Sequence, residues 1–194
     1  MSDSLRCFIA VKMPVAAVER LTEAQQRLRA AEPDWKWVNP EMFHITLKFL
    51  GQVERRRLEG CWREAQEALG EAQRFSVAVK GLGVFPSLRA PRVAWAGISE
   101  GAEELASIAA KVEAVCNRHG FEREKRPFAA HLTLGRARQA RPSSALTAAV
   151  DEFGEVEFGS GTVDRVLLMQ STLRPTGASY TAIGEQSLRD GEGA

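Results

Sequence analysis

The stretch Phe-His-Ile-Thr-Leu-Lys-Phe-Leu-Gly, residues 43–51, holds the pattern on which the expected fold and function of this chain depend. A second stretch, Ala-His-Leu-Thr-Leu-Gly-Arg-Ala-Arg at residues 130–138, repeats its His-x-Thr-Leu core. Polar and apolar residues alternate in both copies, as in a half-buried β-strand. Since residues i and i+2 of a strand project from the same face, each His lies beside its Thr, and the aliphatic residues face the core. The motifs at residues 44–47 and 131–134 are therefore predicted to form two halves of one site.

The repetition gives weight to a short pattern. A single His-x-Thr occurs in many strands without a catalytic role, whereas a duplication that keeps both polar residues needs a reason other than packing. Of the three histidines in the chain, His119 precedes Gly120 at an expected helix end. A cation there complements the helix dipole. We therefore expect His44 and His131, but not His119, to belong to the site.

The composition is that of an ordinary globular protein. The 194 residues are 44% hydrophobic and 26% charged, and the formal net charge is +1. No apolar run approaches the roughly 20 residues of a membrane-spanning helix, and no secretory signal is evident. Cys7, Cys61 and Cys116 are odd in number and widely spaced, so they are predicted to be buried free thiols. These features predict a cytoplasmic protein without a membrane partner.

Positive charge is concentrated around the second motif. Residues 118–141 contain seven Lys or Arg but only two Glu. Such a stretch is commonly a solvated surface. Beside a candidate site, however, it favours a ligand that carries phosphate. Arg136, two residues beyond Leu134, is a candidate for contact with phosphate or with the backbone, and a plain surface role is the alternative.

Hydrophobic periodicity divides the chain into helices and strands. The predicted helices lie at about 15–31, 58–69, 101–119 and 144–153. The predicted strands, besides the two motif strands, lie at 5–11, 75–85, 92–98, 163–173 and 178–188, and Gly51 is expected to end the first motif strand. One polar residue, Gln25, interrupts the apolar stripe of the first helix. Gly81 and Gly83 lack the third glycine and the following helix of a dinucleotide-binding loop, so they are predicted to form bends or bulges in a strand.

The strands come in pairs and several are amphipathic, which favours an α+β fold with antiparallel sheets over a doubly wound parallel sheet. No long Gly/Ser linker separates the two halves. The chain is therefore predicted to be a single bilobal domain spanning residues 1–194. Residues 189–194 are expected to form a frayed tail.

Several blocks of the sequence resemble the two-histidine (2H) phosphoesterase superfamily. The resemblance covers nearly the whole chain and is strongest to the RNA 2′,3′-cyclic phosphodiesterases, also called the 2′-5′ RNA ligase family. It is carried by residues 6–14, 37–51, 81–98, 128–138 and 170–183. The family often has Pro directly before the second His, where this chain has Ala130. That difference is expected to alter the start of the strand and to leave the chemistry intact.

The resemblance implies two α/β lobes related by a pseudo-twofold axis, with antiparallel sheets flanking a central cleft that carries both motifs. It implies a hydrolase that opens 2′,3′-cyclic phosphate ends of RNA to 2′-phosphomonoesters, with ligation through a 2′-5′ bond as the reverse reaction. It also assigns His44 as the general acid and His131 as the general base. RNA ends would be the partner, and the protein would act as a monomer.

The residue types suit this chemistry. In-line displacement at phosphorus puts the attacking and leaving oxygens on opposite sides, and two imidazoles from opposed walls of a cleft can serve both. Histidine populates both protonation states near neutral pH. Thr46 and Thr133 carry rigid hydroxyls that could bind the non-bridging phosphate oxygens. Such a mechanism requires no metal and no cofactor.

Other functions remain open at this stage. A metal site would need more ligands than two histidines. A non-catalytic module that binds RNA ends could use the same cleft, and a relative could act on small cyclic nucleotides, 2′-5′ oligoadenylates or cyclic ADP-ribose phosphate. Phe49 and Phe128 could stack a base, but a core position is the more ordinary expectation for each.

Overall fold

The computed structural model describes residues 4–174 and 177–191. The helices are α1 (Val15–Ala31), α2 (Arg55–Leu69), α3 (Ala102–Arg118) and α4 (Ser144–Glu152), together with the short 3-10 turn η1 (Pro40–Met42). The strands are β1 (Ser4–Lys12), β2 (Lys36–Trp37), β3 (His44–Glu54), β4 (Phe75–Phe85), β5 (Val93–Glu100), β6 (His131–Arg136), β7 (Glu157–Val163), β8 (Arg165–Arg174) and β9 (Gly177–Ser187).

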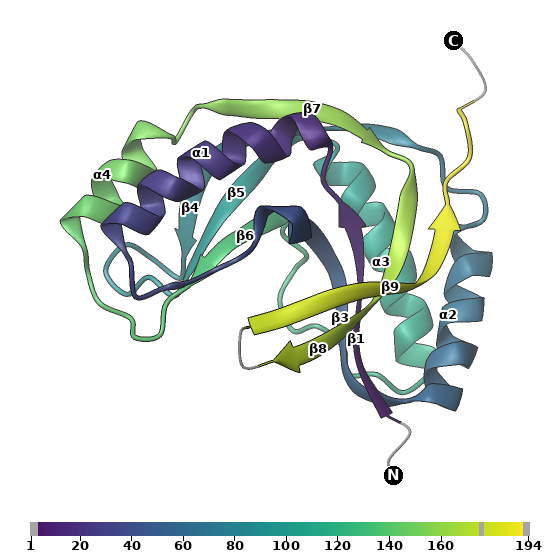
Figure 1. Cartoon of the computed structure of the whole chain (residues 1–194). Helices are drawn as coiled ribbons and strands as arrows, with labels where there is room; N and C mark the ends of the chain where they lie inside the picture. The colour runs from purple at the N-terminus through teal and green to yellow at the C-terminus, as the bar shows by residue number, and fades with distance from the viewer. Residues whose placement is uncertain (1–3, 175–176, 192–194) are drawn as a thin grey trace.

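The named strands form a single curled sheet, in the order β7-β4-β5-β6-β3-β1-β8-β9, with β2 added beside β6 (Figure 1). Every pairing between them is antiparallel. The α+β fold with antiparallel strands is thus confirmed. The structure adds that the sheets of the two lobes are continuous with each other, because the two motif strands, β3 and β6, are direct neighbours.

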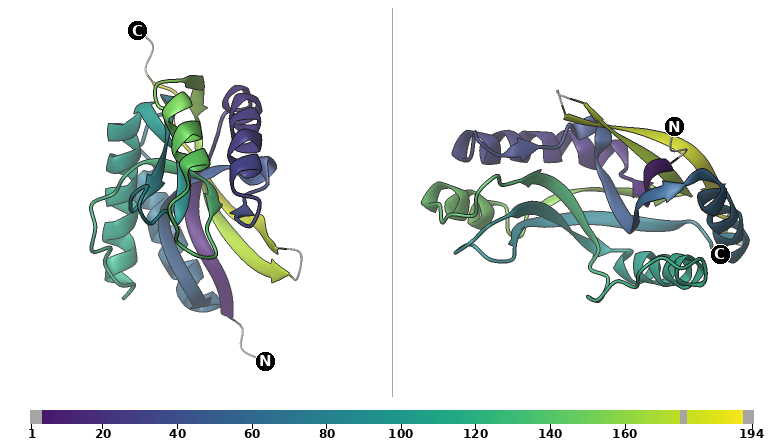
Figure 2. Two further views of the ribbon diagram at one scale, coloured as in Figure 1. Left: turned by 90° about the vertical axis from the view of Figure 1, so that its left-hand side faces the viewer. Right: turned by 90° about the horizontal axis from the view of Figure 1, so that it is seen from below.

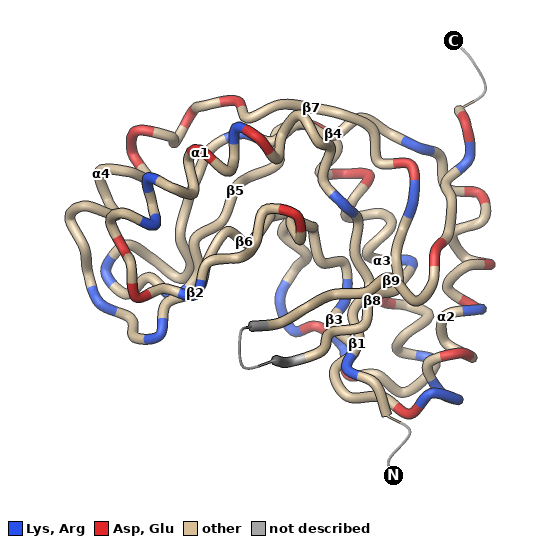
Figure 3. Tube along the Cα trace, viewed as in Figure 1, with Lys and Arg blue, Asp and Glu red and all other residues tan. Residues whose placement is uncertain are grey.

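The helices lie in two groups at the two ends of the sheet (Figure 1). Helix α1 packs against β7 and α4, whereas α2 and α3 pack together and against β3. Figure 2 shows α1 and the β8–β9 hairpin on one side of the sheet and α3 on the other. Both signs of charge are spread over the two groups (Figure 3). The lobes interleave along the chain, since α1 follows β1 but packs on β7, and α3 follows β5 but packs on β3.

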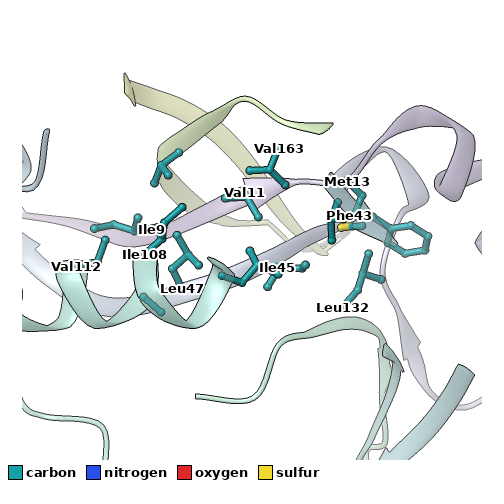
Figure 4. Close-up of a cluster of buried hydrophobic side chains, with 14 of the residues drawn as sticks. Ile9, Val11, Met13, Phe43, Ile45, Leu47, Ile108, Val112, Leu132 and Val163 are labelled. Carbon is teal, nitrogen blue, oxygen red and sulfur yellow. The ribbon is translucent and has the colours of Figure 1, made fainter. Parts of the chain in front are cut away.

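The core lies between the sheet and the helices, and the motif strands contribute to it as their alternation predicts. Ile45 and Leu132 are 1% and 0% exposed. Both belong to the same cluster of apolar side chains as Ile9 of β1 and Ile108 of α3, and Figure 4 shows Ile45 between Leu47 and Leu132. The aliphatic half of each motif therefore anchors its strand, and the His and Thr are left on the opposite, concave face.

One residue pair joins the two lobes at the centre of the sheet. Ile45 of β3 is the partner of Leu132 of β6, and it is the one registered pair between these strands in the described part of the chain. On either side of this pair the strands part, β3 toward α2 and α3, and β6 toward α1 and α4 (Figure 1). The concave face is therefore open where the two motifs begin.

Two expectations need correction. Gly51 does not end the first motif strand, because β3 continues to Glu54 through a register shift, and Gly51 adopts φ +71°, which glycine tolerates. The expected tail does not fray at its first residue. The Arg189 N–H donates to the carbonyl of Ala72, and its own carbonyl accepts from the Arg74 N–H, both at 2.9 Å. Residues 192–194 of that tail lie outside the described residues.

The predicted strand glycines behave as expected. Gly81 has φ +74°, and the pairing of β4 with β5 shifts register between Lys80 and Leu82. Gly81 therefore lies at a bulge within β4, and this segment is a strand and not a nucleotide-binding loop.

We predict that Leu132→Ala will lower the free energy of unfolding by about 2–5 kcal/mol, because it leaves a cavity at the fully buried junction of the lobes. Urea unfolding followed by circular dichroism measures the change. Val15→Ala is the matched control, since Val15 is 76% exposed and its truncation should cost less than about 0.5 kcal/mol. Equal losses in the two variants would contradict the central position of Leu132.

Candidate active site

The histidines of the two motifs lie on a diagonal across two adjacent strands. Because Ile45 pairs with Leu132, continuing this register by one residue sets Thr46 opposite His131 and His44 opposite Thr133. The strands part beyond this pair, so the register sets the order of the two imidazoles and two hydroxyls along the neighbouring strands. The two motifs are therefore side by side at the centre of the curled sheet, one on the central strand of each lobe.

Both imidazoles are held by the same backbone contact. The ring Nδ1 of His44 lies 2.7 Å from the carbonyl oxygen of Met42, and Nδ1 of His131 lies 2.8 Å from that of Ala129. A carbonyl oxygen only accepts, so Nδ1 must carry the proton in each ring. In the neutral ring Nε2 is then a proton acceptor, and in the imidazolium it is a donor. The carbonyl therefore fixes both the orientation and the tautomer of each histidine. Proton exchange is left to Nε2.

A β-bulge at the same position of each motif changes the order of side chains on the concave face. Thr46 pairs with Ala10 and Lys48 with Ile9, so Leu47 is the additional residue in β3. In β6, Thr133 pairs with Trp95 and Gly135 with Ala94, so Leu134 is the additional residue. A bulge shifts the alternation of side chains by one position. The fifth residue after each His, Phe49 or Arg136, is consequently brought to the same face as the histidines.

A buried polar side chain accompanies each bulge. The amide of Gln25, which interrupts the apolar stripe of α1, donates to the carbonyl of the bulged Leu134 at 2.8 Å and to that of Val38 at 2.7 Å. In the first motif, the ammonium of the buried Lys48 donates to the Glu122 carbonyl at 2.7 Å and pairs with Glu113 at 2.8 Å. The polar residue that interrupts the apolar stripe of α1 therefore supports the backbone of the second motif.

His44 lies among aromatic rings. The centroid of Phe8 is 4.9 Å from that of His44, and Tyr180 of β9 meets the imidazole edge-on at 5.3 Å. Burial is the largest influence on this group and lowers its pKa below the ordinary value of 6.5. The Met42 carbonyl opposes that shift, and the positive charge of Arg136 adds to it. In the free protein His44 therefore gives up its proton more readily than an exposed histidine.

His131 is less enclosed. Phe85 meets its ring edge-on at 5.2 Å and stacks on Trp95 at 5.0 Å. Trp95 in turn lies over Gly83, where an added Cβ would stand 2.3 Å from the indole. The glycine of β4 is thus required by the close approach of this ring, and the aromatic pair forms the wall beside the second histidine.

The predicted residues can now be placed. The pairing of Ile45 with Leu132 brings the two motifs to the centre of the sheet, and Arg136 lies near enough for its charge to act on His44. The aromatic residues around the histidines, by contrast, were not identified as site residues from the sequence. They are Phe8, Phe85, Trp95 and Tyr180. They are drawn from four different strands, and only the pairing of those strands reveals their proximity.

The other notable residues lie elsewhere. His119 ends α3 as predicted, and its Nε2 contacts the Glu64 carboxylate at 2.7 Å. Cys7, Cys61 and Cys116 are buried and free, as predicted. Across residues 4–174 and 177–191, no group of three or more His, Cys, Asp or Glu could hold a metal ion. In the same ranges, no helix combines the length and apolarity needed to cross a membrane.

We predict that Arg136→Gln will raise the pKa of His44, because it removes a positive charge that disfavours the imidazolium. A ¹H–¹⁵N NMR titration of the imidazoles measures this directly. Arg138→Gln removes an equal charge from another exposed position of the same segment and should shift His44 less. An unchanged or lowered pKa in Arg136→Gln would show that this guanidinium does not act on His44.

Comparison with known proteins agrees with this geometry. A family model described as LigT like Phosphoesterase matches residues 11–95 and 97–180, so each matched segment contains one motif. An RNA 2′,3′-cyclic phosphodiesterase from Aeropyrum pernix is 38% identical over 170 residues, covering 87% of this chain and 94% of the relative. Another of that name from Archaeoglobus fulgidus is 35% identical over 178 residues, covering 91% and 96%.

Solved structures share the fold. The crystal structure of TT0787 from Thermus thermophilus has a TM-score of 0.80 and 28% sequence identity, and covers 96% of this chain and 99% of that chain. The structure of E. coli LigT complexed with 3′-AMP has a TM-score of 0.75 at 23% identity, with 95% and 98% coverage, and supports the fold alone. With the family model matching both halves of the sequence, this chain belongs to the LigT-like phosphoesterases.

Proposed function

We propose that this protein hydrolyses the 2′,3′-cyclic phosphate at the 3′ end of RNA to a 2′-phosphomonoester. The observation that carries the proposal is the pair of imidazoles on one diagonal, each with Nδ1 bound to a carbonyl and Nε2 left for chemistry. The names of the relatives support the choice of substrate. No metal is needed in this mechanism.

The proposed step is an in-line displacement at phosphorus. Water attacks the phosphorus and loses a proton to Nε2 of His131. The bond from phosphorus to O3′ breaks on the opposite side, and O3′ takes a proton from Nε2 of His44. The product carries the water oxygen in a 2′-phosphate and a free 3′-hydroxyl. Positioned acid and base groups typically contribute about 10²–10⁴-fold each.

The assignment of acid and base follows the family resemblance. It requires that His44 be protonated when the substrate is bound. Burial keeps the pKa of His44 below its ordinary value in the free protein. A bound phosphodiester anion favours the imidazolium and raises that pKa. Binding of the substrate therefore favours the protonated form of His44, which the acid role requires.

The hydroxyls and the arginine have the complementary role. Thr46 and Thr133 alternate with the histidines on the concave face, where they can donate to the non-bridging oxygens as charge develops. Arg136, brought to this face by the bulge in β6, supplies a guanidinium for the same phosphate.

The same constellation supports ligation. When the 5′-hydroxyl of a second RNA replaces water, His131 takes its proton, the bond from phosphorus to O3′ breaks and His44 protonates O3′, which leaves a 2′-5′ bond. By microscopic reversibility the exchanged roles cleave that bond, so reversible 2′-5′ ligation is part of this proposal. We further propose a monomer acting in the cytoplasm. The location is supported by three buried cysteines that remain free in the structure.

We predict that His44→Ala and His131→Ala will each lower kcat/KM by about 10²–10⁴-fold on an oligonucleotide ending in a 2′,3′-cyclic phosphate, assayed with EDTA present. Chromatography of the products should identify a 2′-monophosphate. His119→Gln is the control, since this histidine lies at the end of α3 and contacts Glu64.

Each possible outcome has a definite meaning. Near-normal turnover in either alanine variant would refute the acid–base mechanism. Binding of the oligonucleotide without hydrolysis by the wild type would establish a binding module. Hydrolysis confined to cyclic mononucleotides or 2′-5′ oligoadenylates would move the protein to the small-nucleotide members of its superfamily.

A further inference from the structure

Two neighbouring residues of β3 reverse the usual distribution of polar and apolar side chains. Lys48 is only 3% exposed, whereas Phe49 is 56% exposed. Regular alternation from His44 would place Phe49 in the core and Lys48 on the concave face. The bulge at Leu47 inverts this order and thereby corrects the expectation of a core position for Phe49. Burying a lysine and exposing a phenylalanine both cost free energy, and such violations of folding rules concentrate at functional sites.

The buried Lys48 fixes the loop that connects α3 to β6. Its ammonium donates to the carbonyl of Glu122 and lies 3.8 Å from the carboxylate of Glu124. Glu113 of α3 pairs with the same ammonium and also accepts from the Glu124 N–H at 3.1 Å. A buried ion pair is weak evidence of stability but can define a conformation. Here it fixes the acidic part of the loop against α3.

The basic residues of this loop remain at the surface. Arg123, Lys125 and Arg126 are all exposed. Lys125 has one weak contact, 3.7 Å to the exposed Glu122. Within the described residues, no carboxylate lies in salt-bridge range of Arg123 or Arg126. The positions of Lys and Arg along this loop, beside β3, can be followed in Figure 3.

These cations border a groove that begins at Phe49. The groove has a volume of about 650 Å³ and is lined by Phe49, Leu50, Gly51, Phe121 and residues 122–126. Its three cations therefore exceed the carboxylates of Glu122 and Glu124 by one charge. It is connected to the histidines through rings. The centroid of Phe49 is 6.2 Å from that of Phe8, which is 4.9 Å from His44. An aromatic face flanked by exposed cations is the composition that binds single-stranded nucleic acid.

We propose that this groove binds the nucleotides on the 5′ side of the reacting end, with a base stacked on Phe49 and backbone phosphates at Arg123, Lys125 and Arg126. The inference rests on the proposed function, because a 2′,3′-cyclic phosphate ends the RNA and the strand can continue only on its 5′ side. The ring of Phe49 contacts Phe8 and lies beyond the rings that touch His44 itself, so a base stacked on it lies next to, and outside, the position held at the imidazole.

The internal repeat supports the same interpretation. Phe49 and Arg136 occupy equivalent places in the two motifs, each five residues after its His and each turned to the concave face by the same bulge. One copy presents a guanidinium beside His44, and the other presents an aromatic ring at the opening of the basic groove. The repeat thus supplies one residue for the phosphate and one for a base.

The test compares two substrates, 2′,3′-cyclic AMP and a pentaadenylate ending in a 2′,3′-cyclic phosphate. The variant R123E/K125E/R126E should lower kcat/KM on the pentaadenylate by about 10-fold or more and leave the mononucleotide within about 2-fold of wild type. Its kcat/KM should also depend less steeply on salt, by about 0.7 in the logarithmic slope for each phosphate that the variant no longer binds. Phe49→Ala should reduce the pentaadenylate rate by about 10-fold, more than the mononucleotide rate.

The matched control is R29E/R56E/R63E, which reverses three exposed charges on α1 and α2, none of which lines the groove. It should keep the wild-type ratio of the two kcat/KM values. An unchanged ratio in both R123E/K125E/R126E and Phe49→Ala would overturn the groove assignment, as would an equal fall in the control. A wild type inactive on both substrates would refute the proposed function itself, so the two failures are distinguishable.

Discussion

The pairing of Ile45 with Leu132 determines how the two halves of this molecule meet. It joins two lobes whose strands otherwise part at this point, and it sets the register of both motifs in one step. The aliphatic side chains are buried in the common core, so the register is specified by the hydrophobic effect. A slip of one residue would turn every polar group of the motifs into that core. Packing on one face of the sheet therefore positions the chemistry on the other.

The duplicated bulge is the second constraint, and it explains residues that alternation alone cannot. At Leu47 and Leu134 the strands gain a residue, which changes the side chain that reaches the concave face. A buried polar side chain accompanies each bulge, and its polar atoms must be satisfied away from water. Gln25 donates to the carbonyl of the bulged Leu134, whereas Lys48, buried by the bulge at Leu47, donates to the carbonyl of Glu122. The two halves thus share the same β-bulge, but it turns Phe49 to the concave face in one half and Arg136 in the other.

The sequence predicted the elements well where periodicity was long and regular, as in α1, whose expected bounds agree with Val15–Ala31. It missed β7, because Gly159 and Gly161 look like a loop. They are required by close packing, since a Cβ at Gly161 would lie 2.4 Å from Pro14. The histidines were found because the motif repeats. The exposure of Phe49 depends on a bulge, and the aromatic environment of His44 depends on pairing between strands that are distant in the sequence. Neither can be deduced from a local sequence pattern.

If two diagonally placed imidazoles serve the two apical oxygens of one phosphorus, a transition-state mimic should touch both of them. A uridine–vanadate complex imitates the trigonal bipyramid of in-line attack, and its crystal structure with this protein would give the distances. We expect one apical oxygen within about 2.6–3.2 Å of Nε2 of His44 and the other equally near Nε2 of His131. Vanadate bound with either apical oxygen out of reach of its imidazole would rule out the two-histidine mechanism.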